Sequence, residues 1–142
     1  MTLVEEDGAL THVDWRAWAE DGAGDESPLL AEAARQLAAY FEGRLTRFDL
    51  PFAPRASKAQ REFCAALSAI PYGETRTYGE MAAALGISAQ AAGQLCGGNP
   101  LPVLIPCHRV LGANGLGGFS APGGIETKVA LLKLEGAAGL LI

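Results

Sequence analysis

Cys107, His108 and Arg109 follow one another in the chain and form a candidate nucleophile site. A thiol attacks as its thiolate, and a free cysteine is only a few per cent ionised near neutral pH. An adjacent imidazole and a nearby cation both favour the thiolate. A second interpretation stays open on these residues alone, because a cysteine after an apolar run is commonly a small core residue.

The segment before this triplet is the element that must position the thiol. The run from Leu101 to Pro106 is apolar and bounded by prolines, and it follows Asn99-Pro100. This composition predicts a strand-like segment that delivers Cys107 to the site.

The remaining ligand-type residues argue against a metal centre. The chain has three cysteines, Cys64, Cys96 and Cys107, and two histidines, His12 and His108. An odd number of thiols argues against a disulfide framework. No two cysteines have C-x-x-C spacing, and His12 lies far from all three, so we expect no zinc or other metal.

Charge is distributed unevenly between the two halves of the chain. Residues 1–53 carry eleven acidic and four basic residues, a net charge of −7, whereas residues 54–142 carry five acidic and seven basic residues, a net charge of +2. Contacts with phosphates should therefore belong to the second part. The N-terminus is acidic and has no basic segment followed by an apolar run, and the uncharged stretch 110–125 contains six glycines. We therefore expect a cytoplasmic protein without a secretory signal or a membrane span.

The first 53 residues read as a small α/β domain. Thr2–Val4 and Leu10–Trp15 predict a hairpin around a turn at residues 5–8. Ser27-Pro28 predicts the start of a helix that ends at Gly43 and carries Leu30, Ala34, Leu37 and Phe41 at helical spacing. Residues 44–56 are turn-rich and predict a link to the second part.

The second part, residues 54–142, reads as mostly helical. A helix is predicted from Ser57 to about Ile70, with Phe63, Leu67 and Ile70 on one face. Thr77 is expected to cap a helix over 78–85 that closes at Gly86, and a further helix is expected over 89–96. Two short helices joined by a glycine-containing turn predict a helix-turn-helix, a pattern that also occurs in small helical domains that do not bind DNA.

Three motifs in order carry a resemblance to a known family. Pro106-Cys107-His108-Arg109-Val110, preceded by Asn99-Pro100, resembles the acceptor motif of the O6-alkylguanine-DNA alkyltransferases, or methylated-DNA–protein-cysteine methyltransferases. The run from Ile70 to Gly79 resembles the family's entry to its helix-turn-helix. Gly118-Phe119-Ser120 to Lys128, then Leu131 to Gly136, resembles its active-site loop and closing helix. The similarity covers about residues 29–137 and is strongest over 70–136.

The resemblance implies a catalytic role for five residues. Cys107 would accept the alkyl group, His108 would remove its proton through a bridging water, and Glu135 would orient that imidazole. Tyr78 would protonate the leaving guanine, and Asn99 would tie the recognition helix to the active-site segment. Without the resemblance, Glu135 would read as a solvated helix-end residue, Tyr78 as a packing residue and Asn99 as a turn residue.

The resemblance also implies contacts to the substrate. Val110 and Ser120 would contact the flipped base through main-chain atoms. For Arg109 two roles stay open, one in the local electric field and one in a structural ion pair.

Three positions depart from the family pattern. Gln90 stands where an arginine is expected to fill the gap left by the flipped nucleotide, and glutamine is a weaker phosphate partner. Phe119 replaces a frequent tyrosine before Ser120, which bears on substrate range. Cys64 stands where a core tryptophan is common and bears on packing.

The resemblance implies a monomeric DNA-repair protein with an α/β N-terminal domain and a mostly α, winged-helix-like C-terminal domain with a helix-turn-helix. Its partner would be double-stranded DNA containing O6-alkylguanine, and O4-alkylthymine is a further expected substrate. The alkyl group would pass to Cys107 irreversibly, once per molecule, without cofactor or metal. Two rival functions are compatible with parts of this pattern. An alkyltransferase-like protein flips alkylguanine without efficient repair, but such proteins replace the acceptor cysteine. A transcription factor would need basic recognition residues, which this chain lacks.

Overall fold

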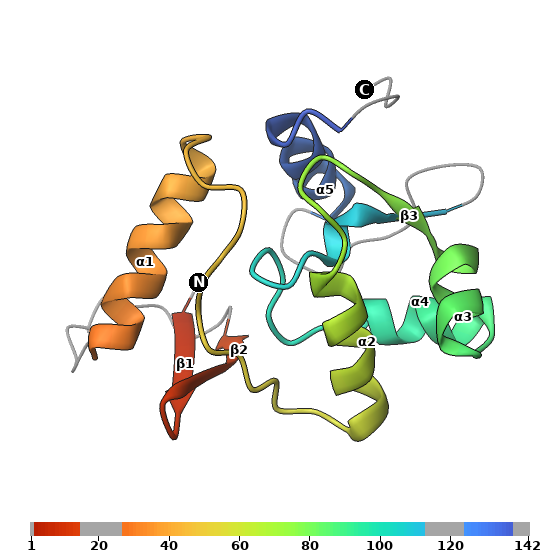
Figure 1. The fold of residues 1–142 in the computed structure, drawn as a ribbon, viewed down its shortest axis with the longest axis horizontal. Helices are drawn as coiled ribbons and strands as arrows, with labels where there is room; N and C mark the ends of the chain where they lie inside the picture. Colours follow the sequence, from red (N-terminus) through yellow and green to blue (C-terminus); the bar gives the residue numbers. More distant parts are fainter. Residues whose placement is uncertain (1, 15–26, 113–123, 138–142) are drawn as a thin grey trace. The chain divides into compact units, whose positions relative to one another are not determined.

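A computed structural model describes residues 2–14, 27–112 and 124–137 of the chain. The chain divides into two units, Met1–Arg55 and Ala56–Ile142 (Figure 1). The first unit contains a two-stranded sheet and a helix, and the second unit is mostly helical. The predicted fold class, an α/β first part followed by a mostly α second part with a helix-turn-helix, is confirmed.

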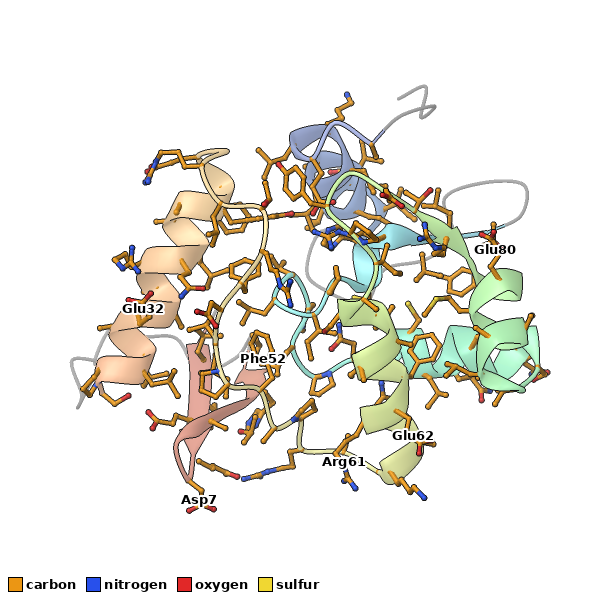
Figure 2. All side chains as sticks on the ribbon, in the orientation of Figure 1. Asp7, Glu32, Phe52, Arg61, Glu62 and Glu80 are labelled. Atoms are coloured by element: carbon orange, nitrogen blue, oxygen red, sulfur yellow. The ribbon has the colours of Figure 1, made fainter. Side chains whose placement is uncertain are left out.

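The hairpin of the first unit has a longer first strand, an earlier second strand and a tighter turn than the sequence predicted. Strand β1 spans Thr2–Glu6 and strand β2 spans Ala9–Asp14. The turn is therefore only Asp7-Gly8, and both residues have positive φ, as a two-residue turn between twisted antiparallel strands needs. Figure 2 shows Asp7 at the tip of this hairpin. Trp15, expected at the end of the second strand, lies outside the described residues.

The segment predicted as a link continues the first unit's sheet. Leu10 and Phe52 form a parallel bridge, with Leu10 N donating to Pro51 O at 2.9 Å and Ala53 N donating to Leu10 O at 2.8 Å. Phe52 accordingly lies beside β2 in Figure 2. The first unit thus brings together residues that precede its helix in the chain and residues that follow it.

Helix α1 spans Pro28–Phe41 and begins as the sequence predicts. The Ser27 hydroxyl accepts a hydrogen bond from Leu30 N at 3.1 Å, and proline occupies the first turn. The buried face differs from the spacing read in the sequence, because Phe41 is exposed while Tyr40 is buried. The buried residues of this helix are Ala33, Gln36, Leu37, Ala39 and Tyr40.

Three capped helices form the first part of the second unit. Helix α2 spans Lys58–Ser68, helix α3 spans Tyr78–Leu85, and helix α4 spans Ala89–Gly97. Their caps are serine or threonine hydroxyls at Ser57, Thr77 and Ser88. Thr77 and Glu80 form a reciprocal capping box, and Figure 2 shows Glu80 at the start of α3. Helices α3 and α4 form the predicted helix-turn-helix, with Gly86 in the left-handed conformation (φ 70°) at the turn.

The elements that complete the second unit carry the candidate site. The 3-10 helix η2 spans Cys107–Arg109, and strand β4, Val110–Leu111, follows it directly. Strand β4 pairs in parallel with β3, Arg76–Thr77, so the start of α3 lies next to the residues that follow Cys107. Helix α5, Gly124–Leu134, closes the unit (Figure 1).

The strand predicted over Leu101–Pro106 is wrong. The chain turns there instead, with Ile105 N donating to Leu101 O at 2.8 Å and an isolated bridge between Pro102 and Ile105. Val103 adopts a positive φ of 75°, which an extended strand excludes. Prolines lack the N–H that a strand ladder requires, so the apolar run is buried as a turn.

Candidate functional site

Asn99 holds the turn that precedes the candidate nucleophile. Its Nδ2 donates to Ile105 O at 2.8 Å, and its Oδ1 accepts from Leu101 N at 2.9 Å. The side chain is buried, so both bonds are shielded from water. Asn99 lies just after helix α4, and its amide therefore fixes the end of that helix to the backbone two residues before Cys107.

Cys107 opens helix η2 and is only 2% exposed. A hydrogen bond with the Cys96 side chain lowers the pKa of Cys107, against the effect of burial, which raises it. A hydrogen bond with Asn99 and the positive charge of Lys128 also lower it. The largest cause is Cys96, a residue that the sequence did not single out for the site. The thiol is thus biased toward its reactive thiolate form.

His108 is fully buried and is held by Glu135. Its Nε2 lies 2.7 Å from Glu135 Oε2, and neither side chain is exposed to solvent. Burial lowers the pKa of His108, and the hydrogen bond with Glu135 opposes that shift. An ionised carboxylate only accepts, so Nε2 carries the proton and Nδ1 carries the lone pair.

The Nδ1 atom of His108 is the one buried side-chain nitrogen or oxygen without a hydrogen-bond partner among the residues that the structure describes. An unpartnered buried acceptor costs free energy unless a water or a reacting group meets it. The arrangement therefore supplies a neutral base whose basic nitrogen is available for a proton from outside the dyad.

Arg109 pairs with the same carboxylate. Its Nε lies 2.9 Å from Glu135 Oε1, its Nη2 lies 2.9 Å from Oε2, and its Nη1 donates to Ile70 O at 2.6 Å. This fork geometry is the bidentate pair that a guanidinium forms best with a carboxylate. Of the two roles that the sequence left open, the geometry is that of the ion pair. We call His108, Arg109 and Glu135 the ionic cluster.

Lys128 and Tyr78 form a second polar group in the same unit. Lys128 is fully buried on α5, and its Nζ donates to Val110 O at 2.6 Å. The same Nζ lies 5.8 Å from the centroid of the Tyr78 ring, in a cation–π arrangement. Burial lowers the pKa of Lys128.

The sequence reasoning missed Lys128 and Cys96 as site residues. For Lys128 a signal was present, because it shares a helical face with the buried Leu131 and Leu132, and an isolated lysine on an apolar face needs a partner. Cys96 follows the buried Ala92 by four residues, which predicts burial but not a neighbour.

The remaining predicted residues are distributed as follows. Val110 is fully buried in β4 and holds the ammonium of Lys128 through its carbonyl. Gln90 lies on the exposed face of α4. Ser120, and Phe119 beside it, lie outside the described residues. The structure brings Cys107, His108, Arg109, Glu135, Asn99 and Val110 together around helix η2 and strand β4.

The described residues contain neither a metal-binding group nor a membrane-spanning helix. Within residues 2–14, 27–112 and 124–137, no three histidine, cysteine, aspartate or glutamate side chains are grouped so that they could hold a metal ion. No helix in the same ranges is long and apolar enough to cross a membrane.

Comparisons with known proteins agree over both units. Residues 1–54 match the family described as 6-O-methylguanine DNA methyltransferase, ribonuclease-like domain, and residues 58–137 match its DNA binding domain. A methylated-DNA–protein-cysteine methyltransferase of Mycolicibacterium paratuberculosis is 44% identical over 95% of this chain and 85% of its own length. The corresponding protein of Methanosarcina acetivorans is 49% identical over 75% of this chain and 69% of its own length.

Solved structures agree as well. Mycobacterium tuberculosis OGT in complex with DNA superposes with a TM-score of 0.80 at 40% identity, covering 95% of this chain and 85% of that one. The O6-methylguanine methyltransferase of the same organism superposes with a TM-score of 0.78 at 37% identity, over 99% of this chain and 88% of that one.

Proposed function

Because this chain belongs to the 6-O-methylguanine DNA methyltransferase family and repairs DNA by alkyl transfer, we propose that the Cys107 thiol accepts the alkyl group from O6-alkylguanine. The observation that carries the proposal is the buried Glu135–His108 dyad, whose 2.7 Å hydrogen bond leaves the lone pair of His108 Nδ1 without a partner among the described residues. The base, His108, directly follows Cys107 in the chain, and the pKa of the Cys107 thiol is already lowered.

The proposed reaction proceeds by direct displacement. His108 takes the Cys107 proton through a bridging water, and the thiolate attacks the alkyl carbon. The new S–C bond forms as the C–O6 bond breaks, and its electron pair leaves with the guanine. The Tyr78 hydroxyl then supplies a proton to the guanine. The product, an S-alkylcysteine, is a stable thioether, so each molecule acts once.

DNA is the partner of this family's DNA binding domain, and the finer partner assignment is part of the proposal. The target base must leave the stack to reach a buried thiol, because Cys107 cannot approach an alkyl group inside a duplex. Val110 and Ser120 would contact the flipped base, and Gln90 on α4 would take the place that the base vacates. O4-alkylthymine is included as a second substrate.

We also propose that the protein acts as a monomer in the cytoplasm. A single-turnover acceptor needs a free thiol, and reducing compartments keep thiols free. All three cysteines, Cys64, Cys96 and Cys107, are free and buried.

The test is a stoichiometry measurement. The protein is incubated with an excess of duplex DNA containing one O6-methylguanine, and intact mass and peptide mapping are then recorded. We expect one methyl group per molecule, on Cys107 and not on Cys64 or Cys96, and none in Cys107→Ala. Multiple turnovers, or repaired DNA beside unmodified Cys107, would contradict the proposal. Tight binding without transfer would instead indicate the alkyltransferase-like alternative.

A further inference from the structure

Cys96 is a buried residue of helix α4 whose thiol faces the nucleophile. It is 5% exposed, and its Sγ lies 3.6 Å from the carbonyl oxygen of Cys107, to which it donates. Its side chain also interacts with the Cys107 thiol, and this interaction raises the pKa of Cys96. The reaction proposed above uses Cys107 and leaves the neighbouring Cys96 thiol without a role.

Ionising both thiols of this buried pair is unfavourable, because two adjacent negative charges repel strongly there. Their mutual hydrogen bond and burial raise the pKa of Cys96 far above its usual range, while the same bond lowers the pKa of Cys107. The interaction thus favours the protonated form of Cys96 beside an ionised Cys107. A protonated thiol beside a thiolate is a hydrogen-bond donor.

The other groups around Cys107 do not duplicate this donor. Asn99 uses its amide on the backbone of Leu101 and Ile105 as well as on the thiol. Lys128 contributes positive charge, but its Nζ donates to Val110 O. The Cys64 thiol donates to Asn99 Oδ1 at 3.9 Å, and its pKa is raised mainly by burial.

We propose that Cys96 is a positioning residue for the alkyl-transfer reaction, whose S–H donates to Cys107 Sγ when that atom is a thiolate and so fixes and stabilises the nucleophile. A thioether accepts hydrogen bonds weakly. After transfer the Cys96 proton therefore turns back to the Cys107 carbonyl, the second acceptor within its reach. The inference rests on the proposed function, because it assigns Cys107 as the nucleophile.

The test compares variants that remove or keep the donor. Cys96→Ala removes it, Cys96→Ser keeps an O–H of similar size, and Cys96→Val removes it while filling the space should the alanine variant not fold. The matched control is Cys64→Ala, which removes a buried thiol whose hydrogen bond goes to Asn99 Oδ1. Carboxamidomethylation of Cys107 by iodoacetamide is followed against pH by peptide mapping, in parallel with methyl transfer from O6-methylguanine duplex DNA.

In Cys96→Ala and Cys96→Val, we expect the midpoint of the Cys107 pH–rate curve to move to higher pH. Below the midpoint the rate should fall about tenfold, while the rates at high pH should converge with those of the unaltered protein. Cys96→Ser and Cys64→Ala should keep the original midpoint. An unmoved midpoint in the donor-free variants, or an equal movement in Cys96→Ser, would overturn the inference.

The iodoacetamide reaction requires no DNA and no base flipping, which separates the two proposals. A shifted midpoint in a protein that transfers no methyl group would support the role of Cys96 and contradict the proposed function. Normal methyl transfer to Cys107 with no shift would do the reverse.

Discussion

The interior of the second unit carries charge, whereas the helix expected to face DNA carries none. Arg109, Lys128 and Glu135 are all buried, although such residues are almost never fully buried unless they are paired. Helix α4, by contrast, contains no charged residue, and its exposed positions include Gln90 and Gln94. This is the inverse of the distribution that a phosphate-binding domain favours.

The difference shows where electrostatics acts in this protein. In the ionic cluster each charge is held by at least two hydrogen bonds, and burial makes those interactions stronger than they would be in water. Charge here serves to orient a base and to bias a thiol. Helix α4 has no charged side chains, so the binding of DNA should depend little on the electric field of that helix. The following predictions test the two sides in order of expected effect.

The largest effect should follow Glu135→Gln. This change strands the guanidinium of Arg109 in the interior, and breaking a buried pair costs about 3–5 kcal/mol of unfolding free energy. Urea unfolding measures the loss. The double variant Arg109→Met/Glu135→Gln should recover much of it, because no unpaired charge remains. Glu126→Gln, at an exposed position of helix α5, serves as the control and should cost less than about 1 kcal/mol.

A loss below about 1 kcal/mol in Glu135→Gln would mean that the interior tolerates the unpaired charge. Water reaching Arg109 would then have to replace the carboxylate. This outcome would remove the contrast between the interior and α4. Glu135→Gln would in that case also be suitable for kinetic measurements, because only a variant that loses much stability is a poor probe of chemistry.

His108→Ala is the cleaner test of proton transfer. It leaves the Arg109–Glu135 pair in place, and methyl transfer at neutral pH should slow about a hundredfold or more because the base is gone. Raising the pH should restore much of the rate, since the Cys107 thiolate then forms without a base. Single-turnover kinetics across pH measures both effects. A rate that is unchanged at neutral pH would show that the thiol is activated without the imidazole.

The pH dependence of stability gives a smaller signal from the same residue. Because burial lowers the pKa of His108 from 6.5, the unfolded chain binds this proton more readily than the folded protein does. Stability should therefore fall as pH drops below about 6.5, with a slope of at most about 1.4 kcal/mol per pH unit. His108→Gln should flatten that part of the curve, whereas His12, present in both proteins, cancels in the comparison. Parallel curves would contradict the assignment.

The parts of the fold predicted correctly are those that local chemistry determines. Ser27, Ser57 and Thr77 begin helices because a hydroxyl at that position satisfies a free backbone N–H, and the residues involved lie within one turn. Gly86 ends α3 because the left-handed conformation suits glycine. Such signals are readable in a single sequence.

The parts that failed depend on residues distant in the sequence or on a single side chain. The turn at Leu101–Ile105 replaces a strand because the Asn99 amide binds its backbone at two points. The role of Arg109 stayed open because its partner, Glu135, lies 26 positions away, directly after the end of helix α5. Cys96 and Lys128 have no local motif, and only the fold brings them to Cys107.

The smallest expected effect concerns Gln90, the exposed side of the comparison. An arginine here would add one phosphate contact, and one contact changes the slope of log K against log salt by about −0.9. Gln90→Arg should therefore bind duplex DNA more tightly, with the gain growing about threefold to fourfold between roughly 200 and 50 mM salt. Its transfer rate with the free alkylated base, which needs no flipping, should stay unchanged.

Gln94→Arg separates charge from position, because it places the same cation at another exposed site of α4, one turn along the helix. Both variants should steepen the salt dependence of binding. Only Gln90→Arg should also speed repair of duplex DNA, since it alone would place a larger side chain in the gap left by the flipped base. Paired rates on duplex and free-base substrates at two salt concentrations provide the measurement. If the two variants gain equally on duplex DNA, charge on α4 is what the chain lacks, and Gln90 is not the residue that fills the stack. If neither gains, another segment already performs both tasks, and the neutral face of α4 is not a deficit.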